Sequence, residues 1–321
     1  MRRLRDVGEH AWIAALARRL AVRRADRRIL LGPGDDAAAI RPGRRPLLFT
    51  ADALVENVHF RAGWAAPAAL GRRAWAVNAS DLAAMGGVPR FALLALEAPP
   101  ALRAADLDAL VRGFVAAARR DGARLVGGNL AAGPHLAITA AVIGEAPGAM
   151  VTRAGARPGD ELYVTGALGA AGLAVRRLTA GAAARLPDPP RRVRAGRLLA
   201  RVASAMIDVS DGLLQDAGQL CRASRVGAEI DLGRLPIAGA CRRALGRRAA
   251  AFAARAGEDY ELLVAVPPAR EPALRRVAPR LGCSLTSVGR LLAGRPVVRV
   301  RAPDGRVVRV ARGGGFDHFR R

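Results

Sequence analysis

The stretch Met206-Ile207-Asp208-Val209-Ser210-Asp211-Gly212-Leu213 organises this chain. An apolar run ends in two aspartates three residues apart, and Leu213–Cys221 has the pattern of a helix, so we predict a strand-to-helix switch with carboxylates at the strand's end. At ~5 Å and an effective dielectric of ~20 the two charges repel by about 3 kcal/mol, and a hard cation such as Mg²⁺ removes that cost. Taken alone, the stretch favours a plain aspartate N-cap before a helix.

Related acidic motifs recur in the first half of the chain. Gly34-Asp35-Asp36-Ala37 is a glycine-flanked acidic pair between apolar segments, and Leu47–Val55 reads as a buried strand with Asp52 inside it. A carboxylate in a buried strand is costly unless it is paired or coordinated. We therefore expect Thr50, Asp52 and His59 to form a polar cluster near Asp36.

Polar side chains also mark a helix expected over Ala68–Met85. Asn78 and Asp81 lie three residues apart and share one face of this helix, among alanines and a methionine. We predict that this face turns toward a site rather than toward water. Gly127-Gly128-Asn129 is predicted to be a glycine turn at a strand end, between apolar segments.

The composition limits the class of protein. A chain of 321 residues predicts two domains, and no apolar run is long enough to cross a bilayer, so we expect a cytoplasmic protein. The net charge of +25 comes from 52 arginines without a single lysine, in a chain with 4% aromatic residues. Scattered arginines with few aromatics do not indicate a specific nucleic-acid surface.

The missing lysine excludes a Schiff base and a Walker A loop, so phosphate groups would be held by arginine, backbone N–H groups and metal. Three distant cysteines, Cys221, Cys241 and Cys283, match neither a disulfide framework nor a metal site. Several acidic strand ends together with an arginine are what Mg²⁺-assisted phosphoryl transfer needs, since that reaction depends on alignment and charge neutralisation.

The domain boundary is expected in Ala146–Gly159, which is rich in glycine and proline and carries Arg153. Residues 1–145 and 146–321 then form two domains. The second contains strands expected over Asp160–Val164 and Ala228–Leu232, the acidic segment Gly257–Val264, and a hairpin around Pro303-Asp304-Gly305. An aromatic tail, Gly313–Phe319, follows.

Seven motifs in order resemble those of the thiamine-monophosphate kinase family, a branch of the aminoimidazole-ribonucleotide-synthetase-like superfamily. They are Gly34–Ala37, Asp52–Phe60, Asn78–Gly86, Thr152–Asp160, Ile207–Leu213, Gly257–Leu262 and Gly315–Phe319. The resemblance implies an α+β, PurM-like protein of two α/β domains. Its N-terminal sheet would pair across a homodimer into a barrel, and its C-terminal sheet would carry flanking helices and complete the active site.

The same resemblance implies ATP-dependent phosphorylation of thiamine monophosphate to thiamine diphosphate by direct, Mg²⁺-assisted in-line transfer. It assigns catalysis to Asp208, Asp211 and Arg153. The implied Mg²⁺ ligands are Asp36, Thr50, Ala51 through its backbone, Asp52, Asp81, Asn129, Asp208 and Asp211. ATP would contact Gly128, Asn129, Arg153 and Ser210, and thiamine monophosphate would contact His59, Glu258 and Phe316.

Two residues depart from the family pattern. Asn129 stands where the family usually has aspartate, which keeps a carbonyl ligand but loses the charge. Asn57 replaces a glycine in the motif before His59, and asparagine tolerates the left-handed backbone such a turn needs. Aminoimidazole ribonucleotide synthetase and a catalytically silent nucleotide-binding relative are the alternatives; neither a specific nucleic acid nor a membrane is an expected partner.

Overall fold

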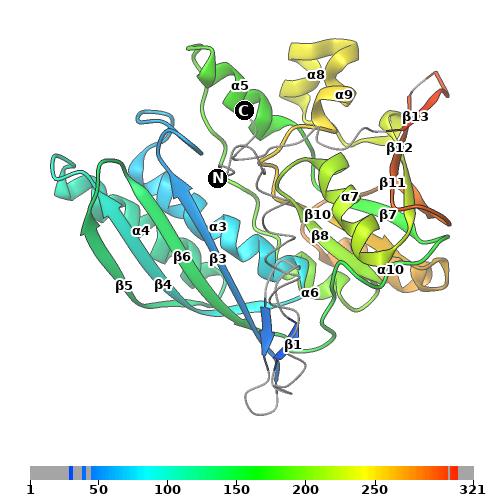
Figure 1. Cartoon of the computed structure of the whole chain (residues 1–321), viewed down its shortest axis with the longest axis horizontal. Coiled ribbons are helices and arrows are strands. Elements are labelled where there is room, and N and C mark those ends of the chain that lie inside the picture. The colour runs from blue at the N-terminus through cyan, green and yellow to red at the C-terminus, as the bar shows by residue number, and fades with distance from the viewer. Residues whose placement is uncertain (1–28, 32–37, 41–44, 303, 310–321) are drawn as a thin grey trace, which may run out of the picture.

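The computed structural model describes residues 29–31, 38–40, 45–302 and 304–309. It contains two β-sheets set side by side, with helix α3 (Pro67–Ala84) between them (Figure 1). The helix that the spacing of Trp12, Ile13, Leu16 and Leu20 predicts over residues 9–24 lies outside the described residues, as do the acidic pair with Asp36 and the tail with Phe316.

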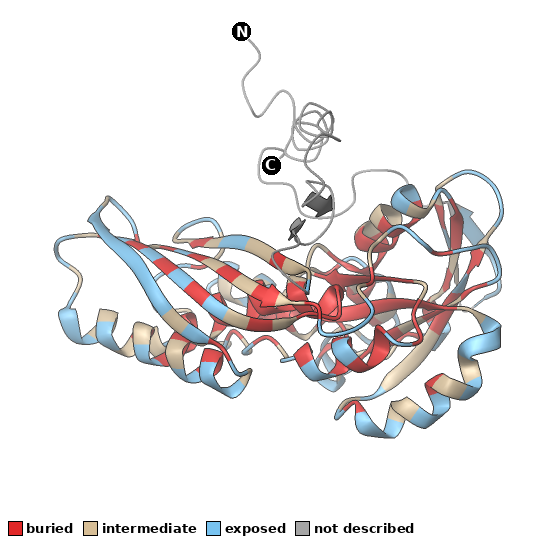
Figure 2. Cartoon of the chain, turned by 90° about the horizontal axis from the view of Figure 1, so that it is seen from below, coloured by how far each residue is buried: buried red, intermediate tan, exposed pale blue. Residues whose placement is uncertain are grey.

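The first sheet has six strands in the order β1-β2-β3-β6-β4-β5. Their bounds are Ile29–Leu31, Ala38–Ile40, Leu47–Val55, Ala137–Glu145, Val88–Ala98 and Arg124–Ala132. The pair β4–β5 is parallel and is joined by α4 (Ala104–Arg120), while the other pairs are antiparallel. In Figure 2 the helices lie along one side of this sheet, and no described helix covers the other side.

The second sheet has seven strands in the order β13-β12-β9-β11-β7-β10-β8. Their bounds are Val307–Arg309, Val298–Arg301, Gly227–Asp231, Leu285–Leu292, Glu161–Thr165, Glu261–Val266 and Ala205–Val209. The helices around it are α5 (Ala170–Thr179), α6 (Val193–Leu199), α7 (Leu213–Ser224), α8 (Gly239–Leu245), α9 (Ala249–Ala253) and α10 (Glu271–Val277). Four short 3₁₀ turns complete it, Leu232–Arg234, Gly246–Arg248, Pro268–Arg270 and Ala278–Arg280.

Helix α3 is buried on nearly every side because glycines of the neighbouring helices let their backbones approach it closely. A Cβ added to Gly113 of α4 would lie 2.1 Å from the Ala68 carbonyl oxygen, and one added to Gly196 of α6 would lie 2.0 Å from that of Ala83. Trp75 packs edge to face on Phe114, with ring centroids 5.6 Å apart. One hydrophobic core therefore joins the first sheet, α3, α6 and the inner strands of the second sheet.

Most expected elements are confirmed, including the strand Leu47–Val55, the helix over Ala68–Met85, the strand-to-helix switch at β8–α7 and the hairpin β12–β13. Two local interpretations are wrong. Gly127-Gly128-Asn129 is not a turn but the middle of β5, where a Cβ on Gly128 would lie 1.9 Å from the Leu94 carbonyl oxygen. The glycine is needed there because two backbones approach closely.

The second correction concerns the burial of β3. Asp52 and Ala51 are exposed, because β2 pairs only with Leu47–Phe49 and the described residues place no strand beside the rest of that edge. Separately, none of the described helices has the length and apolarity that crossing a bilayer would require.

Candidate functional site

The polar face of α3 turns inward and meets β3. Thr50 Oγ1 donates to Asp81 Oδ2 at 2.5 Å, and the Asp52 backbone N–H donates to Asn78 Oδ1 at 3.0 Å. Asn78 is fully buried and its amide also donates to the Ala74 carbonyl, one turn earlier. Asn78 and Asp81, three residues apart on α3, thus hold the Thr50 side chain and the Asp52 backbone of β3 in one cluster.

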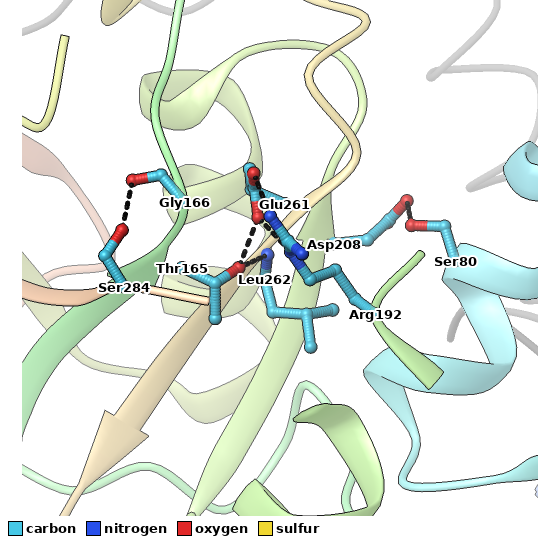
Figure 3. A network of polar contacts seen from close by, with 8 residues as sticks. All are labelled: Ser80, Thr165, Gly166, Arg192, Asp208, Glu261, Leu262 and Ser284. Carbon is cyan, nitrogen blue, oxygen red and sulfur yellow. Dashed lines mark hydrogen bonds and ion pairs between the residues drawn. The ribbon is translucent and has the colours of Figure 1, made fainter. Parts of the chain in front are cut away.

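The same helix reaches the second sheet through a residue that sequence reasoning did not select. Ser80 Oγ donates to Asp208 Oδ2 at 2.8 Å, and both side chains are buried (Figure 3). Asp208 is the last residue but one of β8, the edge strand beside α3. Ser80 therefore links the Asp81 cluster to the Asp208–Asp211 turn across 128 positions of sequence. It lies between Asn78 and Asp81, so its own place in that motif is the signal that could have found it.

The turn after β8 is shaped by Asp216 from the first turn of α7. Asp216 Oδ2 accepts from the backbone N–H groups of Asp211 and Gly212, both at 3.1 Å. Burial and the nearby charges of Asp211 and Asp208 raise the pKa of Asp216 well above its usual value. This buried carboxyl group fixes the backbone that presents Asp211.

Arg153 lies next to the same turn. Its guanidinium Nη1 donates to Gln219 Oε1 at 2.9 Å, while Gln215 Nε2 donates to Asp211 Oδ2 at 3.0 Å. Its backbone is tied to α7 because Ser224 Oγ donates to the Arg153 carbonyl at 2.7 Å. Helix α7 therefore brings the predicted ATP-contacting arginine and the predicted metal-binding turn together, a neighbourhood that spacing alone did not show.

Glu258 joins this site through a strained loop. Glu258 and Tyr260 have φ values of 72° and 48°, in the left-handed region. Their backbone N–H groups donate to the carbonyls of Ser210 and Val209, each at 2.7 Å. Glu258, predicted to contact the substrate, is thereby held directly beside the turn with Ser210.

His59 stands at the turn that follows β3. Its Nδ1 accepts from the Val55 backbone N–H at 3.0 Å, which leaves Nε2 on the other side of the ring. Asn57 adopts φ 65°, the left-handed conformation predicted for it. The side chain that replaces glycine in this motif is therefore accommodated.

Gly128 and Asn129 lie three strands away from Asp52 in the first sheet. Asn129 is level with Ala95 of β4, Thr139 of β6 and Ala53 of β3. Three strand spacings of ~4.8 Å separate β5 from β3, or about 14 Å. That separation is too wide for Asn129 and Asp52 to share one ion, since Mg²⁺–oxygen distances are about 2 Å.

The donor set fits Mg²⁺ in its chemistry. Among the described residues no three carboxylate, histidine or cysteine groups converge closely enough to enclose a metal ion. Mg²⁺ is usually bound by one or two carboxylates, with substrate phosphates and water completing its octahedron. The Thr50–Asp81 pair and the Asp208–Asp211 turn supply only hard oxygen ligands, so they suit a metal that arrives with a nucleotide.

Comparison with known proteins was made at the level of families, sequences and structures. The family model described as "AIR synthase related protein, N-terminal domain" matches residues 34–146, and its C-terminal counterpart matches residues 157–301. The chain is 37% identical to the thiamine-monophosphate kinase of Escherichia coli K12, over 97% of this chain and 98% of that protein. It is 39% identical to that of Halobacterium salinarum, over 83% and 90%.

Among solved structures, one described as "AaThiL complexed with AMPPCP and TMP" superposes with a TM-score of 0.85 at 30% identity. The superposition covers 99% of both chains.

Proposed function

The chain belongs to the thiamine-monophosphate kinase family and has the two-domain fold of the AIR synthase related proteins, and we propose the following working site for it. The enzyme transfers the terminal phosphoryl group of ATP directly to the phosphate of thiamine monophosphate, which gives thiamine diphosphate and ADP. The relative in complex with AMPPCP and TMP supports both ligands.

The observation that carries this proposal is the Ser80–Asp208 hydrogen bond. It joins the cluster of Thr50, Asp52 and Asp81 to the Asp208–Asp211 turn in one continuous polar site. Phosphoryl transfer asks a protein mainly to align two phosphates and to neutralise charge. A site with carboxylates from both sheets, and with Arg153 beside them, meets that need.

We assign the metal to Thr50, the Ala51 backbone, Asp52, Asp81, Asp208 and Asp211, with Asp36 as a further ligand. Bound Mg²⁺ supplies neutralisation of the phosphate charge. Around it, Arg153 and Ser210 bind the nucleotide, while His59, Glu258 and Phe316 bind thiamine monophosphate. Asp208 and Asp211, with Arg153, form the catalytic group.

We further propose a homodimer in which the first sheets pair face to face. Phe91 and Leu93 on β4 are 47% and 45% exposed, and Val126 and Leu130 on β5 are each 59% exposed. An exposed apolar surface beside an open edge strand is unfavourable in a monomer and typical of an interface. Pairing would close the sheets toward a barrel.

The dimer also gives Gly128 and Asn129 a place in the site. Because they lie about 14 Å from β3 of their own subunit, we propose that they contact the nucleotide bound by the other subunit. Mixing Asn129→Ala with Asp211→Asn tests this: mixed dimers regain turnover if Asn129 acts across the interface, and do not if it acts within its own subunit.

Location in the cytoplasm stays a prediction of the sequence.

The reaction itself is tested by incubating the purified protein with ATP, Mg²⁺ and thiamine monophosphate and reading the products by mass spectrometry. Thiamine diphosphate and ADP in equal amounts are expected. ADP with free phosphate and no thiamine diphosphate would refute the proposed transfer, and so would bound ATP that never turns over.

A further inference from the structure

Arg73 is a buried cation on α3 to which none of the assignments above gives a role. Its side chain is 3% exposed, and burial lowers the pKa of its guanidinium. Nη1 donates to the Pro187 carbonyl at 3.1 Å, and the guanidinium lies over the Tyr260 ring, 5.8 Å from its centroid. Among the described residues Nε has no hydrogen-bond partner. Burying such a charge is costly unless a partner compensates it.

The partner of Arg73 is Glu258. Nη2 of Arg73 pairs with Oε2 of Glu258, whose side chain is 28% exposed. The backbone of Glu258 is already held by Ser210. The carboxylate is thus fixed from both sides, by a backbone anchor to the second sheet and by a guanidinium from α3, while part of it remains open to solvent.

One face of helix α3 holds two carboxylates of the site in place. Arg73 and Ser80 are seven residues apart, which is two turns or about 10 Å along the axis. Ser80 holds Asp208 of the metal-binding turn, and Arg73 holds Glu258 of the substrate loop. One rigid helix of the first domain therefore sets the spacing between Asp208 and Glu258.

We propose that Arg73 is a positioning residue for the acceptor substrate. It keeps the Glu258 carboxylate oriented, with Oε2 engaged, so that the other carboxylate oxygen accepts a hydrogen bond from the amino group of the substrate's aminopyrimidine ring. The inference rests on the proposed function, because it takes thiamine monophosphate as the ligand of Glu258. If the Arg73–Glu258 pair served stability alone, its loss would not weaken the binding of one substrate more than that of the other.

The test compares steady-state KM values for the two substrates in the full-length enzyme. We expect Arg73→Gln to raise the KM for thiamine monophosphate by ~10-fold or more, the loss typical of a charge-assisted hydrogen bond, with the KM for ATP changed less than about twofold. Arg73→Lys should fall between the wild type and Arg73→Gln, since lysine keeps the charge but not the planar fork.

The matched control is Arg72→Gln. Arg72 is the preceding residue of α3 and its Nε pairs with Asp188 Oδ2 at 2.7 Å, but these side chains are 32% and 44% exposed. This variant loses the same charge from the same helix, so both KM values should stay at wild-type levels. A rise in the KM for thiamine monophosphate in this variant too would show a general charge effect and overturn the inference.

A double variant separates positioning from packing. If Arg73 acts only through Glu258, then Arg73→Gln/Glu258→Gln should have the same KM for thiamine monophosphate as Glu258→Gln alone. Additive losses, equal rises in both KM values, or an unchanged KM for thiamine monophosphate in Arg73→Lys would each overturn it. Arg73→Lys keeps the buried charge and Glu258 is partly exposed, so the test does not depend on Arg73→Gln folding. A wild-type enzyme inactive on thiamine monophosphate would instead refute the proposed function.

Discussion

The ion pair between Arg192 and Glu261 gives a stability prediction that can be worked through from its geometry. Nε and Nη2 of Arg192 donate to Oε2 and Oε1 of Glu261 at 2.5 and 2.7 Å (Figure 3). Thr165 Oγ1 donates to Oε2 at 2.6 Å, and Thr165 and Glu261 are 0% and 4% exposed. Burial lowers the pKa of Arg192, but the hydrogen bond and charge of Glu261 outweigh it, so its pKa is raised.

Arg192→Met removes two of these three named donors and leaves the carboxylate buried. Breaking one side of a buried pair costs about 3–5 kcal/mol, so we expect a loss of that size in the free energy of unfolding. Glu261 has little room to move, because a Cβ on Gly166 would lie 1.8 Å from its Oε1. Urea unfolding followed by circular dichroism measures the loss.

Two further variants test the reasoning. Arg192→Met/Glu261→Gln should recover much of the stability, since no charge is then left buried without its partner. Arg275→Met breaks the exposed pair with Glu271, whose side chains are 78% and 43% exposed, and should change little. If Arg192→Met were as stable as Arg275→Met, the buried carboxylate would not be the cause and the argument would fail.

Two other predictions concern the site, and a third concerns the pH dependence of stability. Asp211→Asn should abolish turnover without changing the circular dichroism spectrum; normal activity would remove Asp211 from the site. If Asn129 reaches the Mg²⁺-bound nucleotide of the other subunit, Asn129→Asp adds a charge there and should lower the Mg²⁺ concentration for half-maximal rate, whereas an unchanged value would mean that this residue does not act on that ion. Burial raises the pKa of Asp259 to about 7, above about 4 in an unfolded chain. The contribution of Asp259 to stability should therefore be greatest below about pH 4 and be lost as the pH rises to about 7. Asp259→Asn should flatten that pH dependence, and an unaltered slope would contradict the assignment.

Local patterns predicted the parts of the site that depend on short-range geometry. The switch at Met206–Leu213, the shared face of Asn78 and Asp81, and the left-handed Asn57 all follow from backbone preferences within a few residues. The error at Gly127–Asn129 has the same origin. Glycine is typical of turns, but here it permits close approach of β4, a neighbour that no local pattern reveals.

By itself the sequence determined which residues carry oxygen ligands and at which strand ends they stand, because hydrophobic periodicity and turn chemistry act locally. Only the tertiary structure decided which of them meet. The pairs Ser80–Asp208, Arg73–Glu258 and Arg192–Glu261 join residues 128, 185 and 69 positions apart. The first two of these contacts depend on the burial of α3 between the two sheets, while the strand order of the first sheet leaves Asn129 about 14 Å from β3. Such neighbours are set by the packing of whole elements, which a linear pattern does not encode.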